Sequence, residues 1–169
     1  MKIIGALFIV TASFFLGYAR RAAALQSEKT AAALAALFRE LADGIEYGCA
    51  RLGPQLDALC AAERFALLDF LPAACALADG GHSLHDALNE GFLASACRQR
   101  LNHEEQAAAD LVLCALGCET DGPAVRELRG AERKFAEFAE TRHKANTARG
   151  GFYEAIYTLC GAAAAILLL

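Results

Sequence analysis

Two apolar runs lie near the ends of the chain, and a long middle with charges of both signs separates them. The first run, Ile3–Ala19, ends at Arg20 and Arg21. As a helix it reaches about 25 Å, close to the roughly 30 Å of a bilayer's hydrocarbon core. The last run, Phe152–Leu169, reaches about 27 Å as a helix, and its one charge, Glu154, falls near the water boundary. The pattern therefore predicts a transmembrane helix at each end.

Each run also has a competing interpretation. Lys2 and the small residues Ala22–Ala24 fit a cleaved signal peptide. Paired arginines between the apolar run and these alanines argue against cleavage, as does an odd number of cysteines in an exported chain. The last run is short enough to be a buried core helix, but its uncapped Ile-Leu-Leu-Leu end favours spanning.

Helix-start and helix-stop signals divide the rest of the chain into helices. The first apolar run continues into alanine-rich sequence with few breakers, so one long rod is expected. Ser83 and Asn102 are N-cap residues at the starts of later helices. Pro72 removes a backbone hydrogen bond and predicts a kink or break near Leu71. The predicted helices are Ile3–Cys49, Pro54–Ala62, Arg64–Ala78, one from Ser83 to about Cys97, one from Asn102 to Leu116, and a long one from Pro123.

Apolar stripes at three- and four-residue spacing support a helical bundle. One stripe runs along the first helix and another, at close to heptad spacing, along the last. Their members are Leu34, Leu37, Phe38, Leu41 and Ile45, and Val125, Leu128, Phe135 and Phe138. No strand-like alternation of useful length occurs. We therefore predict an all-α bundle of about six helices, flanked by two transmembrane helices.

The basic residues that flank the two apolar runs indicate an orientation. Each of these residues lies between an apolar run and the middle of the chain. The positive-inside rule therefore places the middle of the chain in the cytoplasm and both termini across the membrane. These flanks are Arg20, Arg21, Arg142, Lys144 and Arg149. The predicted organisation is a first membrane segment at residues 1–21, a cytoplasmic helical domain at 22–151 and a second membrane segment at 152–169.

Composition narrows the classes of function. The net charge is −4 and no dense basic stretch occurs, so a nucleic-acid partner is not expected. None of the seven cysteines has C-x-x-C spacing, and the four histidines form no metal-binding pattern with them. Cys114 and Cys118 are spaced to share a helix face, but two ligands do not make a metal site. Reduced core cysteines in a reducing compartment are expected.

The best candidates for catalysis are weak. Glu104 and Glu105 fall in the first turn of a predicted helix, where acids usually serve as caps and dipole partners. His82 and His85 flank a glycine-rich turn and would need further ligands to bind zinc. No nucleotide-binding, serine-hydrolase or zinc-protease motif occurs. We therefore expect no catalytic residues, no metal, no cofactor and no small-molecule substrate.

Four groups of residues, taken in order, resemble one known family. They are Lys2 with Gly5-Ala6 and Gly17; Leu41 and Ile45-Glu46-Tyr47 followed by Pro54, Leu56 and Ala58-Leu59; Leu116-Gly117 with Asp121; and Tyr157, Leu159 and Gly161 before an aliphatic end. Their order and spacing resemble the stage III sporulation protein AB family of endospore-forming bacteria. The chain departs from that pattern at Asp86-Ala87-Leu88, where the family commonly has Trp, at Gly122-Pro123 and at Cys160.

The resemblance implies a place in a channel-like complex, in the mother-cell membrane around the forespore. It implies a central domain similar to the cytoplasmic helical domain of the type II secretion platform protein F. By that analogy the domain would dock an ATPase, stage III sporulation protein AA, with membrane lipid and other stage III proteins as further partners. The family has no known catalytic residues.

The candidate docking surface consists of two turns, Asp79–Ser83 and Cys118–Pro123, because loops carry contacts more often than helix interiors do. Their acidic residues are Asp79, Glu119 and Asp121; the alternative is that the turns only connect helices. Two other functions stay open. One is a platform component of a type II secretion or type IV pilus machine, and the other is a membrane-anchored thiol sensor or enzyme that uses the cysteines.

Overall fold

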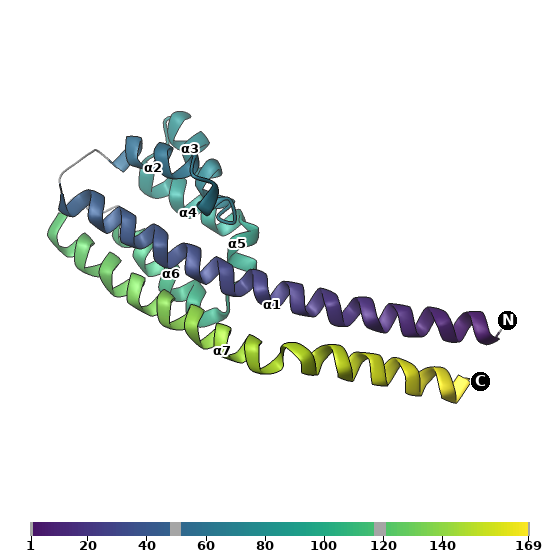
Figure 1. The fold of residues 1–169 in the computed structure, drawn as a ribbon. Helices are drawn as coiled ribbons and strands as arrows, with labels where there is room; N and C mark the ends of the chain where they lie inside the picture. Colours follow the sequence, from purple (N-terminus) through teal and green to yellow (C-terminus); the bar gives the residue numbers. More distant parts are fainter. Residues whose placement is uncertain (1, 48–51, 117–120, 169) are drawn as a thin grey trace. The chain divides into compact units, whose positions relative to one another are not determined.

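Every regular element in the described part of the chain is a helix. A computed structural model describes residues 2–47, 52–116 and 121–168, and contains no strand within these ranges. Two long helices, one near each end of the chain, are separated in the sequence by a series of short ones (Figure 1). The elements are α1 Lys2–Glu46, α2 Leu52–Cys60, the 3₁₀ turn η1 Glu63–Phe65, α3 Phe70–Asp79, α4 Leu84–Ala94, α5 Ala96–Gln99, α6 His103–Ala115 and α7 Asp121–Leu168. The all-α prediction is confirmed.

The chain forms two compact units, and both long helices contribute to each. The terminal unit consists of residues 1–26 and 141–169, and the central unit consists of residues 27–140. The domain ends expected from the sequence, after residues 21 and 151, both fall within the terminal unit. The predicted rod is a single helix as far as Glu46, and α7 stays helical through Gly150 and Gly151.

In the central unit, the second half of α1 runs antiparallel to the first half of α7 (Figure 1). The Phe38 and Phe135 rings meet edge to face with centroids 5.5 Å apart, and both residues are fully buried. The predicted stripes are confirmed: Leu34, Leu37, Phe38, Leu41, Leu128 and Phe135 are buried, and Ile45, Val125 and Phe138 are half-buried. The residue spacing alone was sufficient to predict these buried positions, because the buried face of a helix repeats every three to four residues.

The third predicted helix is wrong in its first part. In place of a helix beginning at Arg64, the chain makes the short turn η1 and then starts α3 at Phe70. Pro72 therefore lies in the first turn of α3, where its missing N–H would have had no partner within the helix. The expected break exists, but it lies before Phe70, and the proline sits near a helix start.

The fourth predicted helix also ends early, at Ala94. Ser95 then accepts a hydrogen bond from the backbone N–H of Arg98 and caps the short helix α5. The Asp69 carboxylate accepts from the N–H groups of Ala96 and Cys97 at 2.8 and 2.9 Å. Because this second cap comes from a distant loop, residue periodicity around Cys97 gave no sign of it.

The two predicted N-caps are confirmed. Ser83 accepts from the Asp86 N–H at 3.1 Å, and its hydroxyl donates to the Asp86 carboxylate at 2.6 Å. Asn102 and Glu105 form a complete capping box at the start of α6. Gly91 lets α4 approach α3 closely, because an added Cβ would lie 3.0 Å from the Phe70 carbonyl oxygen.

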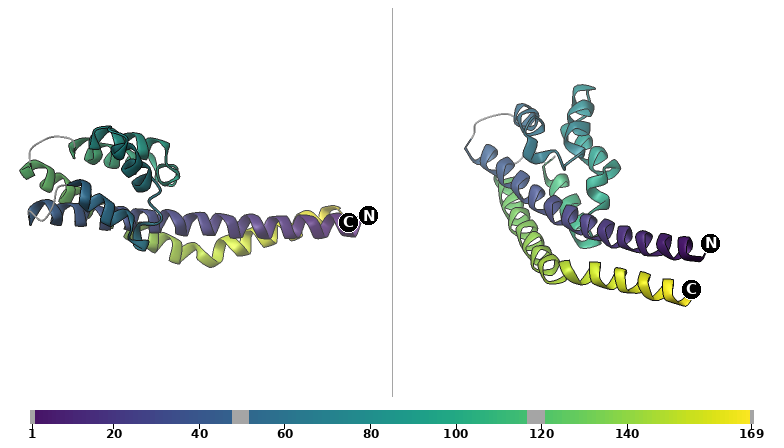
Figure 2. Two further views of the ribbon diagram at one scale, coloured as in Figure 1. Left: turned by 90° about the horizontal axis from the view of Figure 1, so that it is seen from above. Right: turned by 45° about the vertical axis from the view of Figure 1, so that its right-hand side comes forward.

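The terminal unit is an antiparallel pair of helices joined through small residues. A Cβ added at Gly17 would lie 3.2 Å from the Tyr157 Cβ, and one added at Gly161 would lie 2.8 Å from Ser13. The Asn146 side chain donates to the Ala24 carbonyl at 3.3 Å. Figures 1 and 2 show both chain ends at the same end of this pair.

No helix in the described part of the chain meets the length and hydropathy required of a membrane span. Of the residues that bound the predicted spans, Ala19 and Phe152 are exposed, whereas the side chain of Ile3 and the whole of Leu169 lie outside the described part. The two transmembrane helices stay predictions.

Candidate docking site

Asp79, the first residue of the predicted docking surface, lies at the last position of α3, beside an acidic cavity. The cavity has a volume of about 110 Å³ and is lined by Leu56, Asp57, Cys75, Ala78, Asp79 and Leu84. Asp57 and Asp79 are both exposed. The packing of α2 against α3 thus adds a second carboxylate to the predicted one, giving an acidic face formed by Asp57 and Asp79.

The other two residues of the predicted surface cannot be placed beside Asp79. Glu119 lies outside the described residues, and of Asp121 only its position at the start of α7 is described. Asp57 was missed by sequence reasoning because it lies within a short helix, and only packing brings α2 and α3 together. No local signal in the sequence pointed to it.

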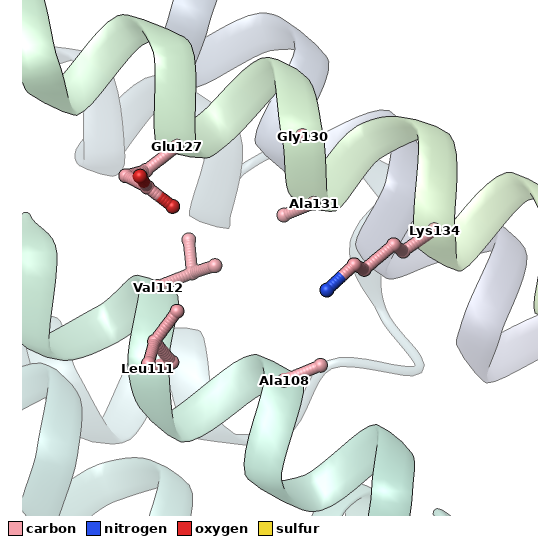
Figure 3. A pocket seen from close by; sticks show the side chains of 7 residues that line it. All are labelled: Ala108, Leu111, Val112, Glu127, Gly130, Ala131 and Lys134. Atoms are coloured by element: carbon pink, nitrogen blue, oxygen red, sulfur yellow. The ribbon is translucent and has the colours of Figure 1, made fainter.

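A second hollow, of about 150 Å³, opens between α6 and α7 (Figure 3). Leu111 and Val112 line it from α6, and Glu127 and Lys134 reach in from α7 at its two ends. Leu111 is 62% exposed. Ligand pockets commonly measure about 300–1,000 Å³, so these two hollows are better suited to a protruding side chain than to a nucleotide or a metabolite.

A set of ion pairs fixes the end of α1 to α7. Arg129 donates to the Asp43 carboxylate at 2.5 Å, to Glu46 at 2.8 Å and to Glu132 at 3.3 Å. Hydrogen bonds to Glu46, Asp43 and Glu132, in that order, raise the pKa of Arg129 above its usual value. This cation therefore joins the two long helices at the end of the central unit away from residue 27.

The weak catalytic candidates have structural roles or lie apart. Glu105 is 1% exposed, and its carboxylate accepts from the Asn102 N–H in the capping box at 2.9 Å. Glu104 and His82 are exposed. His85 contacts the Asn89 side chain at 3.2 Å within its own helix. These four residues do not converge on a common point.

Two cysteines that are distant in sequence touch. The Cys60 and Cys75 sulfurs lie 2.8 Å apart, between α2 and α3. Burial, followed by the neighbouring Cys60 and Asp57, raises the pKa of Cys75 to about 12. Of the pair expected to share a helix face, Cys114 is exposed on α6 and Cys118 lies outside the described residues. Among residues 2–47, 52–116 and 121–168, no three His, Cys, Asp or Glu side chains gather as a metal site.

The basic flanks all belong to the terminal unit and lie at a similar level on its two helices. The hydrogen bond from Asn146 to Ala24 joins α7, between Lys144 and Arg149, to α1 just past Arg20 and Arg21. Arg142 is half-buried, and the other four flanking residues are exposed. The positive-inside argument assumes that the basic residues after the first apolar run and those before the last lie at the same surface of the membrane. Their similar level along the two helices is what that assumption requires.

Comparison with known proteins supports the resemblance seen in the sequence. The sequence model of one family, described as stage III sporulation protein AB, matches residues 2–169. Parallel comparisons with curated proteins and with solved structures gave no match.

Proposed function

We propose, since the chain belongs to the stage III sporulation protein AB family, that it acts as a non-catalytic membrane scaffold. The family sets the context as sporulation. In this proposal the terminal unit lies in the mother-cell membrane around the forespore, and the central unit faces the cytoplasm as part of the stage III channel complex. There it docks an ATPase of the stage III sporulation protein AA type.

The observation that carries the proposal is the apolar outer surface of the terminal unit. Of the thirteen large apolar side chains exposed among the described residues, ten belong to this unit, including Phe8, Phe15 and Ile166 at 70%, 69% and 74% exposure. Exposed apolar surface of this extent marks a binding or membrane surface. Close packing of the two helices through Gly17 and Gly161 is typical of paired membrane helices.

We expect the two ends of the chain and the central unit to be on opposite sides of the membrane. One epitope tag is placed after Leu169 and another, in a second variant, within the turn at Gly80-Gly81. Each variant is expressed in vegetative bacterial cells, where the plasma membrane is the membrane available to it, and protoplasts of these cells are treated with a protease. The tag at Leu169 should be removed and the tag at Gly81 protected, because the basic flanks hold their side in the cytoplasm.

Permeabilised protoplasts are the control, and both tags should be lost there. Protection of both tags in intact protoplasts would contradict the two spans, and loss of the Gly81 tag alone would reverse the orientation.

Docking of the ATPase is expected to depend on the acidic face formed by Asp57 and Asp79. Reversing both charges, Asp57→Lys with Asp79→Lys, should lower co-purification of the ATPase at least tenfold. A basic surface of the ATPase that pairs with this face would then meet like charges, which cost several kcal/mol at an interface. The full chain in detergent is the bait, and bound ATPase is measured by quantitative immunoblot.

Two further double variants carry the same change of charge. Glu90→Lys with Glu137→Lys alters exposed acids on α4 and α7 and should leave recovery unchanged. Glu119→Lys with Asp121→Lys tests the second predicted turn separately. Full recovery with both the Asp57/Asp79 and the Glu119/Asp121 variants would rule out docking through the predicted surface.

A platform component of a secretion or pilus machine stays the alternative function. Such a component would share the helical domain, but expression confined to sporulating mother cells would distinguish the proposed role from it.

A further inference from the structure

The Cys60 and Cys75 sulfurs lie closer together than two thiols that are merely packed side by side. They are 2.8 Å apart, less than an ångström beyond the roughly 2.05 Å of a disulfide bond. The two residues lie on different helices, α2 and α3, so a bond between them would join two elements that otherwise meet only by packing.

The surroundings leave the pair accessible to a small oxidant. Both cysteines are half-buried, and Cys75 lines the open cavity that also contains Asp57 and Asp79. Cys97, by contrast, is fully buried. The exposed thiols of Cys114 and Cys160 have no second sulfur beside them in the described part of the chain.

We propose that Cys60 and Cys75 form a reversible disulfide when the protein meets a peroxide, which makes the α2–α3 contact a redox-modification site. The inference is independent of the proposed scaffold function, because it rests only on the two sulfurs and their access to solvent.

The chemistry is balanced with hydrogen peroxide as the oxidant. The Cys60 thiolate attacks one peroxide oxygen; an S–O bond forms, the O–O bond breaks, and the departing hydroxide takes up a proton as water. Cys75 then attacks the Cys60 sulfur, so that the S–S bond forms, the S–O bond breaks, and a second water leaves with the Cys75 proton. Two thiols and one peroxide thus give one disulfide and two waters.

The environment of Cys75 assigns the order of the two steps. Burial, the neighbouring Cys60 and Asp57 raise the pKa of Cys75 to about 12, so its thiol is almost entirely protonated at neutral pH. Since the thiolate is the nucleophile, Cys75 is the less suited of the two to attack peroxide. Once Cys60 is a neutral sulfenic acid, a Cys60 thiolate no longer raises the pKa of Cys75, and Cys75 can attack the Cys60 sulfur.

The test uses the full chain, reduced and purified in detergent, and one equivalent of hydrogen peroxide. After free thiols are alkylated, trypsin and endoproteinase Asp-N together release Cys60 within residues 57–64, Cys75 within residues 69–78 and Cys97 within residues 86–98. Mass spectrometry should find the 57–64 and 69–78 peptides linked, with the linkage lost on adding dithiothreitol. Cys97 should remain a free thiol, and it should be alkylated only after the protein is unfolded.

Single variants test the order of attack. With Cys75→Ser, Cys60 should stop as a sulfenic acid that dimedone labels; with Cys60→Ser, dimedone labelling of Cys75 should be at least tenfold weaker. Labelling of Cys75 in the Cys60→Ser variant at the rate seen for Cys60 would overturn the order. Oxidation of Cys114 and Cys160 with no linked 57–64 and 69–78 peptides would overturn the site.

Discussion

Replacing Phe38 by Ala is expected to open the central unit roughly 10²–10⁴ times more often, because a buried Phe→Ala change costs about 3–5 kcal/mol. Phe38 is fully buried on α1, and its ring packs against Phe135 of α7, which in turn packs edge to face against Phe138 with centroids 5.7 Å apart. The truncation therefore leaves a cavity where the two long helices meet. Domains of this size are stable by only about 5–15 kcal/mol, so the loss is a large share of the total.

Cys97 provides the measurement for this prediction. Its side chain is fully buried, and burial raises the pKa of its thiol to about 12, so it should react with a thiol reagent only when the central unit opens. The labelling rate of Cys97 in the full chain, read by mass spectrometry, then reports the opening equilibrium. Leu93→Ala is the matched control because Leu93 is 62% exposed, and it should change the rate little. An unchanged rate in Phe38→Ala would show that the α1–α7 contact does not stabilise the central unit.

Patterns confined to one helix were predictable from the sequence. The stripe from Leu34 to Ile45 required only a helical period, and the caps at Ser83 and Asn102 required only a side-chain acceptor placed before the first turn. Each of these features depends on residues a few positions apart, and each is found in the fold.

Features that depend on packing between helices were not predictable. Pro72 was expected to interrupt a helix because the predicted helix began well before it, at Arg64. In the fold Phe65, Leu68 and Leu71 are all buried, but they belong to a 3₁₀ turn, a loop and the start of α3. A proline is compatible both with a break in a helix and with the first turn of a new helix. Which of the two occurs depends on whether the residues before the proline are helical.

The candidate sites also divide into features set by one local segment and features set by packing between helices. Asp79 could be proposed from its turn, but its neighbour Asp57 and the contact between Cys60 and Cys75 arise only because α2 lies against α3. Cysteines fifteen residues apart give no sign in the sequence that they meet. The cap that Asp69 places on α5 is likewise a contact between segments far apart in the chain.

Replacing Gly161 by Leu is expected to separate the two helices of the terminal unit. A Cβ at this position would already lie 2.8 Å from the Ser13 Cβ and Oγ and 3.4 Å from the Val10 Cα, so a leucine has no room unless the helices move apart. Overpacking of this kind costs about 1–3 kcal/mol, which corresponds to roughly 5- to 150-fold in the pairing equilibrium. Gly5→Leu is the matched control, since nothing lies within 4 Å of a Cβ added at Gly5 on the same helix pair.

A cross-link between the helices measures this separation in isolated membranes. A Cβ at Gly17 would lie 3.2 Å from that of Tyr157, slightly below the range of about 3.5–4.5 Å found in disulfides, so Gly17→Cys with Tyr157→Cys should cross-link under mild oxidation in a Cys160→Ser background. A protease site inserted at Gly80-Gly81 allows detection, because only cross-linked chains stay in one piece on a non-reducing gel after cleavage. Adding Gly161→Leu should reduce the cross-linked fraction strongly, whereas adding Gly5→Leu should not. Equal cross-linking in both would mean that contact at Gly161 does not hold the terminal unit together, and the close pairing invoked for the membrane helices would lose its support.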